Sequence, residues 1–240
     1  MRMLFVVTAI AIVTLAGCTT VPLSPRHPSA SVVPEVPSMS VTRPSPSVPT
    51  KRTCCQAALP GPSRLAIVRT AAKLVGARTI TSEGRRIAYD CAGVTRAIFF
   101  KHGIDLYDGS TRDPDANGVR LIHAHMQQHG RLHQSPTPHP GDLVFFDNTW
   151  DFNGDGQLND PLTHVGVVER IDPDGTVIFI SRVAAAIQRY RMNLSSPHLH
   201  KTTEGRILND YLRRKHPTDP DNHARLTGEL FTFFGTRLDF

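Results

Sequence analysis

The chain has 240 residues, with 40% hydrophobic residues, 20% charged residues and a formal net charge of +6 at pH 7. This length is enough for one or two domains. The positive charge does not indicate a nucleic-acid partner, because Arg2 and residues 18–63 carry +4 of it and leave +2 for residues 64–240.

Residues 1–17 predict a secretory signal peptide. Arg2 gives a positive start, and the stretch from Leu4 to Leu15 is nearly all apolar but too short to span a bilayer. The segment Leu15-Ala16-Gly17-Cys18 resembles the lipobox of bacterial lipoproteins. The resemblance implies cleavage before Cys18, lipidation of Cys18, and a membrane anchor at the bacterial cell envelope, facing the periplasm or the exterior. The alternative is an ordinary signal peptide with a chance cysteine.

Residues 18–63 predict a tether. Ten of the 19 prolines lie between Thr19 and Ser63, among many Ser, Thr and Val residues. Such a segment cannot build a hydrophobic core, so it would hold a folded domain away from a membrane surface. Cys54 and Cys55 are adjacent within it, and their role stays open.

Residues 64–240 predict a folded domain of the α+β class. Periodic apolar residues and caps predict helices over 64–76, 91–103 and 118–128. Short apolar or alternating runs between turn residues predict strands over 143–147, 164–171, 176–182 and 186–192, with a hairpin at 164–182. Two further helices are predicted over 206–214 and 225–234. Helices followed by antiparallel strands, with a C-terminal helical extension, give an α+β order.

Cys91 is the candidate nucleophile, and it is the only cysteine in residues 64–240. Its predicted place in the first turn of a helix, after the capping residue Asp90, would lower the pKa of the thiol and offer backbone N–H groups to an oxyanion. His164 opens a predicted strand and is the candidate general base. The alternatives are a small buried thiol and a structural histidine.

Three segments resemble the successive motifs of NlpC-like cell-wall cysteine peptidases and the related CHAP amidases. They are Tyr89-Asp90-Cys91-Ala92-Gly93, the run from Pro140 to Phe146, and the run from His164 to Val168. The resemblance implies a papain-like fold, with the cysteine helix packed on an antiparallel sheet, and cleavage of amide bonds in peptidoglycan stem peptides without a required cofactor. It also implies nucleophile Cys91 and base His164, with Tyr89 near the oxyanion and Asp90 capping the helix or meeting a substrate amine.

The third catalytic position of the family falls on Ser181, where His, Asn, Gln or Asp is usual. A serine hydroxyl can accept a hydrogen bond from imidazole, but it orients the ring less strongly than a carboxylate or an amide. Either Ser181 suffices, another polar group replaces it, or activity is reduced. Ala92, where the family usually has Ser, is a milder departure because the backbone matters more there.

The segment from Asp151 to Asp160 resembles the first half of a calcium loop. Oxygen ligands fall at positions one, three and five, from Asp151, Asn153 and Asp155, with Gly156 at position six. The backbone carbonyl of Gln157 and a side chain at Asn159 or Asp160 would add ligands. The expected closing glutamate is absent, because Leu162 occupies its position. The alternative is a polar, turn-rich loop without metal.

The sequence therefore predicts a lipid-anchored, cysteine-dependent hydrolase whose partners are peptidoglycan and a membrane. Two alternatives stay open. One is a catalytically weak or inactive envelope-binding lipoprotein of the same fold, and the other is a thiol-dependent acyl or amide transferase.

Overall fold

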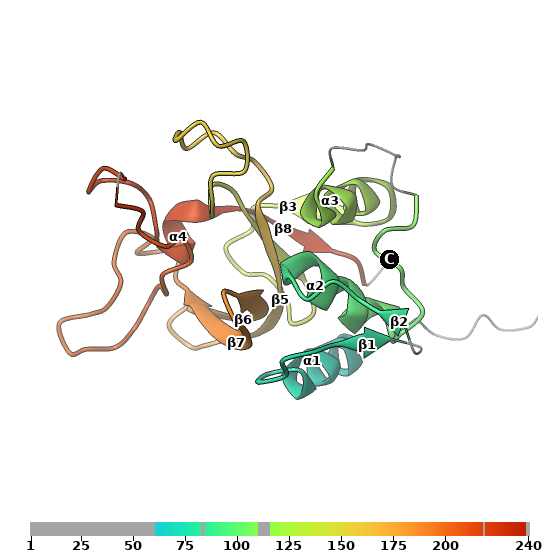
Figure 1. Cartoon of the computed structure of the whole chain (residues 1–240). Coiled ribbons are helices and arrows are strands. Elements are labelled where there is room, and N and C mark those ends of the chain that lie inside the picture. The colour runs from blue at the N-terminus through green and yellow to red at the C-terminus, as the bar shows by residue number, and fades with distance from the viewer. Residues whose placement is uncertain (1–60, 83–84, 110–115, 218, 239–240) are drawn as a thin grey trace, which may run out of the picture. The chain divides into compact units, whose positions relative to one another are not determined.

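The computed structural model describes residues 61–82, 85–109, 116–217 and 219–238 (Figure 1). The predicted signal peptide, the predicted lipidation site Cys18 and all but the last three residues of the predicted tether lie outside this range. Within it, no helix combines the length and the apolar character needed to cross a membrane.

The three helices predicted first are confirmed, and each begins where a polar side chain caps its first turn; among these caps the sequence predicts Asp90. The helices are α1 (Arg64–Lys73), α2 (Cys91–Phe100) and α3 (Gly118–His129). The side chains of Ser63, Asp90 and Asn117 each accept a hydrogen bond from a backbone N–H three residues later. The short strands β1 (Thr81–Ser82) and β2 (Arg85–Arg86) pair within the segment predicted as a loop.

The strands form a six-stranded antiparallel sheet in the order β3-β8-β4-β5-β6-β7. The four predicted strands are confirmed as β4 (Leu143–Phe146), β5 (His164–Ile171), β6 (Val177–Val183) and β7 (Ala186–Met192). The predicted hairpin is β5 and β6. Two strands of this sheet were not predicted, β3 (Arg131–His133) and β8 (Phe231–Thr236).

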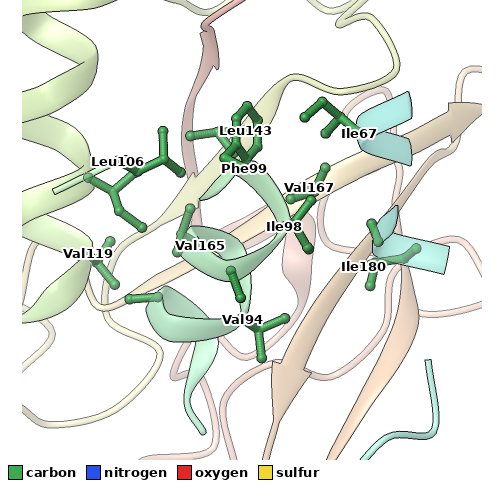
Figure 2. Close-up of a cluster of buried hydrophobic side chains, with 14 of the residues drawn as sticks. Ile67, Val94, Ile98, Phe99, Leu106, Val119, Leu143, Val165, Val167 and Ile180 are labelled. Carbon is green, nitrogen blue, oxygen red and sulfur yellow. The ribbon is translucent and has the colours of Figure 1, made fainter. Parts of the chain in front are cut away.

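The first three helices cover one face of the sheet. Helices α1 and α2 pack on β5, α2 also reaches β6, and α3 packs beside α2 (Figure 1). Figure 2 shows the core between the layers, where Ile98 and Phe99 of α2 lie among Val165, Val167 and Ile180 of the sheet. Burial of these apolar side chains fixes α2 on the sheet. The predicted α+β fold is confirmed.

The opposite face of the sheet is covered by the C-terminal segment. Phe146, Phe179 and Phe234 are fully buried there, in one cluster with Leu212 and Leu230. Residues 193–226, which contribute Leu212, form turns and isolated bridges rather than helices. The C-terminal part thus completes the second core layer.

The predicted C-terminal helical extension is wrong. Within 206–214 the backbone N–H groups of Leu208, Asp210 and Leu212 donate to distant carbonyl groups of His200, Arg191 and Arg225. These long-range bonds replace the local bonds of a helix. The second predicted helix shortens to α4 (Thr227–Leu230), and its C-terminal part becomes β8. This aromatic strand lies inside the sheet, between β3 and β4, where its side chains are packed on both faces.

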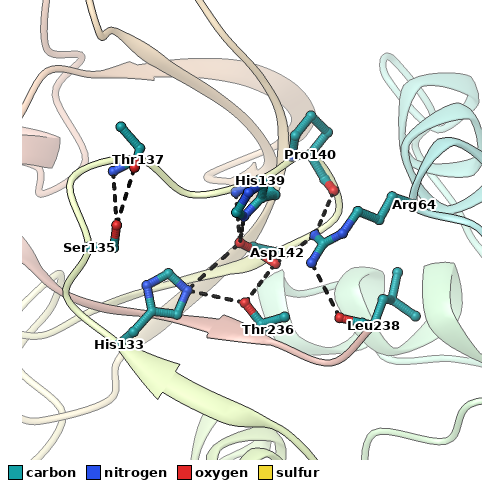
Figure 3. A network of polar contacts seen from close by, with 9 residues as sticks. All are labelled: Arg64, His133, Ser135, Thr137, His139, Pro140, Asp142, Thr236 and Leu238. Atoms are coloured by element: carbon teal, nitrogen blue, oxygen red, sulfur yellow. Dashed lines mark hydrogen bonds and ion pairs between the residues drawn. The ribbon is translucent and has the colours of Figure 1, made fainter. Parts of the chain in front are cut away.

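A buried carboxylate joins α1, β4 and β8 (Figure 3). Asp142 is fully buried just before β4. Its Oδ1 accepts hydrogen bonds from Arg64 Nη1 at 2.8 Å and Thr236 Oγ1 at 3.0 Å, and its Oδ2 accepts one from the backbone N–H of His139 at 2.8 Å. Because both oxygens have partners, the buried charge is compensated.

We expect Asp142→Ala to lower the free energy of unfolding by about 2–4 kcal/mol, because it removes the buried carboxylate that accepts hydrogen bonds from Arg64, Thr236 and the His139 N–H. Urea denaturation of the full-length protein measures this loss. The matched control is Asp221→Ala, which removes an exposed ion pair with Lys215 and should not move the midpoint. Equal midpoints for the two variants would contradict a stabilising role of the buried Asp142 carboxylate.

Candidate active site

One cavity of about 820 Å³ opens at the start of α2 and is lined by both Cys91 and His164. The first residues of α3, the loop at 149–156, the end of β6 and the C-terminal segment complete its wall. The half-exposed Trp150 also lines it. The cavity therefore brings together the two predicted catalytic residues, which lie 73 positions apart in the sequence.

Cys91 is the first residue of α2 and lies against the start of β5. Burial raises the pKa of its thiol to about 11, and the Asp90 charge adds to this effect. The backbone N–H groups of Val165, Ala92 and Cys91 act in the other direction. The helix start thus lowers the pKa as predicted, but burial outweighs it, so the free site holds a neutral thiol at neutral pH.

His164 is held in one tautomer by Ser181. Ser181 Oγ lies 2.7 Å from the carbonyl oxygen of Val165 and 2.9 Å from His164 Nε2. A carbonyl oxygen cannot donate, so the hydroxyl gives its one proton to Val165 and must accept from Nε2–H of His164. This assignment leaves Nδ1 of His164 as the basic nitrogen. Ser181 therefore occupies the orienting position that the resemblance implies.

The imidazole is neutral as well as oriented. His164 is almost completely buried, and this burial, with the positive charge of Arg182, lowers its pKa to about 3. The thiol of Cys91 and the imidazole of His164 are therefore both neutral in the free protein. In the roles predicted for these two residues, a proton would move from the sulfur to the imidazole as substrate arrives.

The segment just before His164 is fixed by side chains from two other elements. Leu162 adopts a left-handed backbone conformation with φ of 58°, which is unfavourable for a branched residue. Its N–H donates to Asp147 Oδ1 at 2.7 Å, and its carbonyl oxygen accepts from Asn117 Nδ2 at 3.1 Å. Sequence reasoning missed Asn117, although its place before α3 is a typical capping signal. It caps α3 and positions the residues leading to His164.

Two glycines permit the close packing of the site. A Cβ atom at Gly93 would lie 2.0 Å from the backbone oxygen of Ala88, so a side chain there would displace the start of α2. A Cβ atom at Gly166 would lie 2.7 Å from the ring of Phe179 and 3.2 Å from Cβ of Ser181. Both motif glycines are therefore required for packing around the catalytic pair.

Of the two residues before Cys91, Asp90 has its predicted role and Tyr89 does not. Asp90 caps α2 through Oδ1, which accepts from the Gly93 N–H at 2.7 Å, and it also lines the cavity. Its predicted capping role is confirmed. The Tyr89 hydroxyl instead donates to the carbonyl oxygen of Ala77, so the structure does not bring it to an oxyanion. The Tyr89 ring stacks on the guanidinium of Arg182.

The loop from Asp151 to Asp160 folds around its own carboxylates. Asp151 accepts from the backbone N–H groups of residues 154, 155 and 156, and Asp155 accepts from that of Gln157. Asp155 Oδ2 accepts from the side-chain amides of Asn153 and Asn159. The described residues hold no group of three or more His, Cys, Asp or Glu side chains arranged for a metal ion.

Asp160 stands apart from the exposed part of this loop. It is buried, and its Oδ1 accepts from the Asn153 N–H at 3.2 Å, while its Oδ2 has no hydrogen-bond partner among the described residues. The loop bonds account for the other carboxylates without a metal. Calcium binding stays a prediction, and Asp160 is the residue whose free oxygen favours it.

Comparison with protein families matches residues 82–182 to the CHAP domain. The match agrees with the resemblance that the sequence motifs indicate, and CHAP domains are generally hydrolases that act on peptidoglycan. The match includes Cys91, His164 and Ser181, whereas α1, β7 and β8 lie outside it. A comparison with curated proteins found no match.

We expect alkylation of Cys91 by iodoacetamide to be slow at pH 7 and to rise about tenfold per pH unit up to pH 10, because a pKa of about 11 leaves a thiolate fraction of ~10⁻⁴ at pH 7. Peptide mass spectrometry of the full-length protein reports Cys91 separately from Cys54 and Cys55. A rate plateau below pH 7 would show a preformed thiolate–imidazolium pair and contradict the neutral pair.

We expect calcium to give a saturable heat in calorimetric titration of the full-length protein, with binding weakened by Asp160→Asn, which removes one ligand charge. The control is Asp172→Asn, in the β5–β6 turn. No heat at millimolar calcium would remove the calcium prediction and leave the loop as a self-bonded turn.

Proposed function

We propose that this protein is a lipid-anchored cysteine hydrolase of the bacterial cell envelope that cleaves amide bonds in peptidoglycan stem peptides. The observation that carries the proposal is the thiol of Cys91 and the oriented imidazole of His164 in one cavity of a CHAP domain. The predicted anchor at Cys18 and the tether would let the domain reach the cell wall from a membrane.

The proposed reaction begins with proton transfer from Cys91 Sγ to His164 Nδ1. The sulfur attacks the carbonyl carbon of the scissile amide, and the electron pair of the carbonyl moves to oxygen. When the tetrahedral intermediate collapses, the C–N bond breaks and the proton on Nδ1 leaves with the amine. Water, deprotonated by Nδ1, then cleaves the thioester and regenerates the thiol.

Backbone N–H groups at the start of α2 are suited to stabilise the oxyanion. The first N–H groups of a helix have no partner within the helix. In α2 the N–H of Gly93 is used by the Asp90 side chain and that of Val94 by the Asp90 carbonyl oxygen. The N–H groups of Cys91 and Ala92 remain, and both lie near the sulfur. They therefore supply the donors in place of Tyr89.

A specific observation also favours a second candidate, an inactive envelope-binding protein of the same fold. Both catalytic groups are neutral in the free site, and the orienting group is the uncharged hydroxyl of Ser181. Such a protein would bind stem peptides in the same cavity without cleaving them.

We expect digestion of purified peptidoglycan by the full-length protein to release new amino and carboxyl termini, and Cys91→Ala to abolish this release because no other cysteine lies in the described residues. Mass spectrometry of the muropeptides identifies the bond. His164→Ala should behave like Cys91→Ala, and His198→Ala, an exposed histidine paired with Glu229, is the control.

Products present with wild type and missing with Cys91→Ala support the hydrolase. Identical products from both proteins contradict it, and retained binding to peptidoglycan would then support the inactive binding protein.

A further inference from the structure

The side chain of Arg182 is placed beside the catalytic pair but has no acidic partner. It follows Ser181 on β6 and lines the cavity with Cys91 and His164. Its guanidinium carbon lies 5.1 Å from the centre of the Tyr89 ring. Its Nε is buried and makes no hydrogen bond, and no carboxylate in the described part of the chain pairs with it. A charged group in this position needs a partner.

The other arginines at the cavity differ from Arg182 in having partners or solvent. Arg213 also has a buried Nε without a hydrogen bond, but its Nη1 donates to the carbonyl oxygen of Asn148 at 3.0 Å and its Nη2 pairs with Asp219 at 3.4 Å. Arg214 is exposed to solvent, where water satisfies its guanidinium. Arg182 therefore differs from both: it is partly buried beside Cys91 and His164, and its guanidinium has no acidic partner among the described residues.

Tyr89 helps to hold Arg182 beside the cavity. The guanidinium lies over the Tyr89 ring, and Tyr89 in turn is fixed by the bond from its hydroxyl to Ala77. The buried Nε of Arg182 has no hydrogen-bond partner among the described residues, and the residue lines the cavity. A guanidinium offers N–H donors that match the oxygens of a carboxylate. Arg182 is therefore held where it can bind an anion in the cavity.

We propose that Arg182 forms a subsite that binds a free carboxylate of the substrate next to the scissile amide. This inference rests on the proposed hydrolase function and deepens it, because it selects stem peptides with a free carboxylate over amidated ones. Tyr89 is a positioning residue of this subsite, which explains a motif tyrosine whose hydroxyl does not face the oxyanion.

Binding at this subsite also acts on the general base. The charge of Arg182 is the second cause, after burial, that lowers the pKa of His164. A carboxylate paired with the guanidinium offsets that charge and makes protonation of Nδ1 easier. A substrate with the correct carboxylate therefore favours the proton transfer from Cys91 that the free site disfavours.

The test uses one synthetic stem peptide with free carboxylates and its fully amidated counterpart. We expect full-length wild type to cleave the free form about 10- to 100-fold better in kcat/KM, as a lost hydrogen bond to a charged group predicts. Arg182→Gln should remove this preference, and Arg182→Lys should restore part of it. The control is Arg189→Gln, an exposed arginine on β7 paired with Glu169, which should retain the wild-type preference.

A binding measurement separates this inference from the hydrolase itself. Cys91→Ala protein is titrated with both peptides, with and without Arg182→Gln. Tighter binding of the free form that depends on Arg182 supports the subsite even if wild type cleaves neither peptide, a result that would overturn the hydrolase alone. Equal affinities of the Cys91→Ala protein for the two peptides, or a preference that survives Arg182→Gln, overturn the subsite.

Discussion

The packing of the first turn of α2 against the first residues of β5 is the constraint on which the site depends. It puts the Cys91 sulfur at the backbone N–H of Val165, and His164 is the neighbour of Val165 in the chain. Near this contact, Gly93 lets the backbone of Ala88 pass close to the start of α2, and Asn117 and Asp147 hold Leu162 in an unfavourable conformation. The strain at Leu162 is thus supported by contacts from outside its own loop.

The same packing has an electrostatic cost. Withdrawing a thiol and an imidazole from water favours their neutral forms, and here burial is the largest cause of both pKa changes. The helix start and the nearby N–H groups act in favour of the thiolate but do not compensate for burial. The proposed reaction therefore needs something entering the cavity to shift this balance toward the thiolate and the imidazolium. A substrate anion that pairs with Arg182 would raise the pKa of His164, which is the required direction.

The sequence predicts those parts of the fold that are coded locally. Apolar periodicity indicates the first three helices, Asp90 caps one of them, and short apolar runs define β5 and β6. The prediction is wrong where long-range contacts determine the secondary structure. Residues 206–214 have helical spacing, yet their N–H groups bond to distant segments, and the aromatic run 231–236 fills a place inside the sheet that no local pattern reveals. For the site, motifs identify Cys91, His164 and Ser181 as candidates. The bond from Tyr89 to Ala77 and the unbonded Nε of Arg182 instead depend on residues that meet only after folding.

Ser181 shows why a weaker orienting group can still define the base. Its hydroxyl proton is committed to the Val165 carbonyl, so toward His164 it acts only as an acceptor, as a carboxylate or an amide oxygen would. It therefore fixes the tautomer and gives the ring a direction. What it lacks is negative charge to stabilise an imidazolium. In this protein orientation comes from Ser181, and the missing electrostatic help must come from elsewhere, which makes the charge state of Arg182 the more important variable.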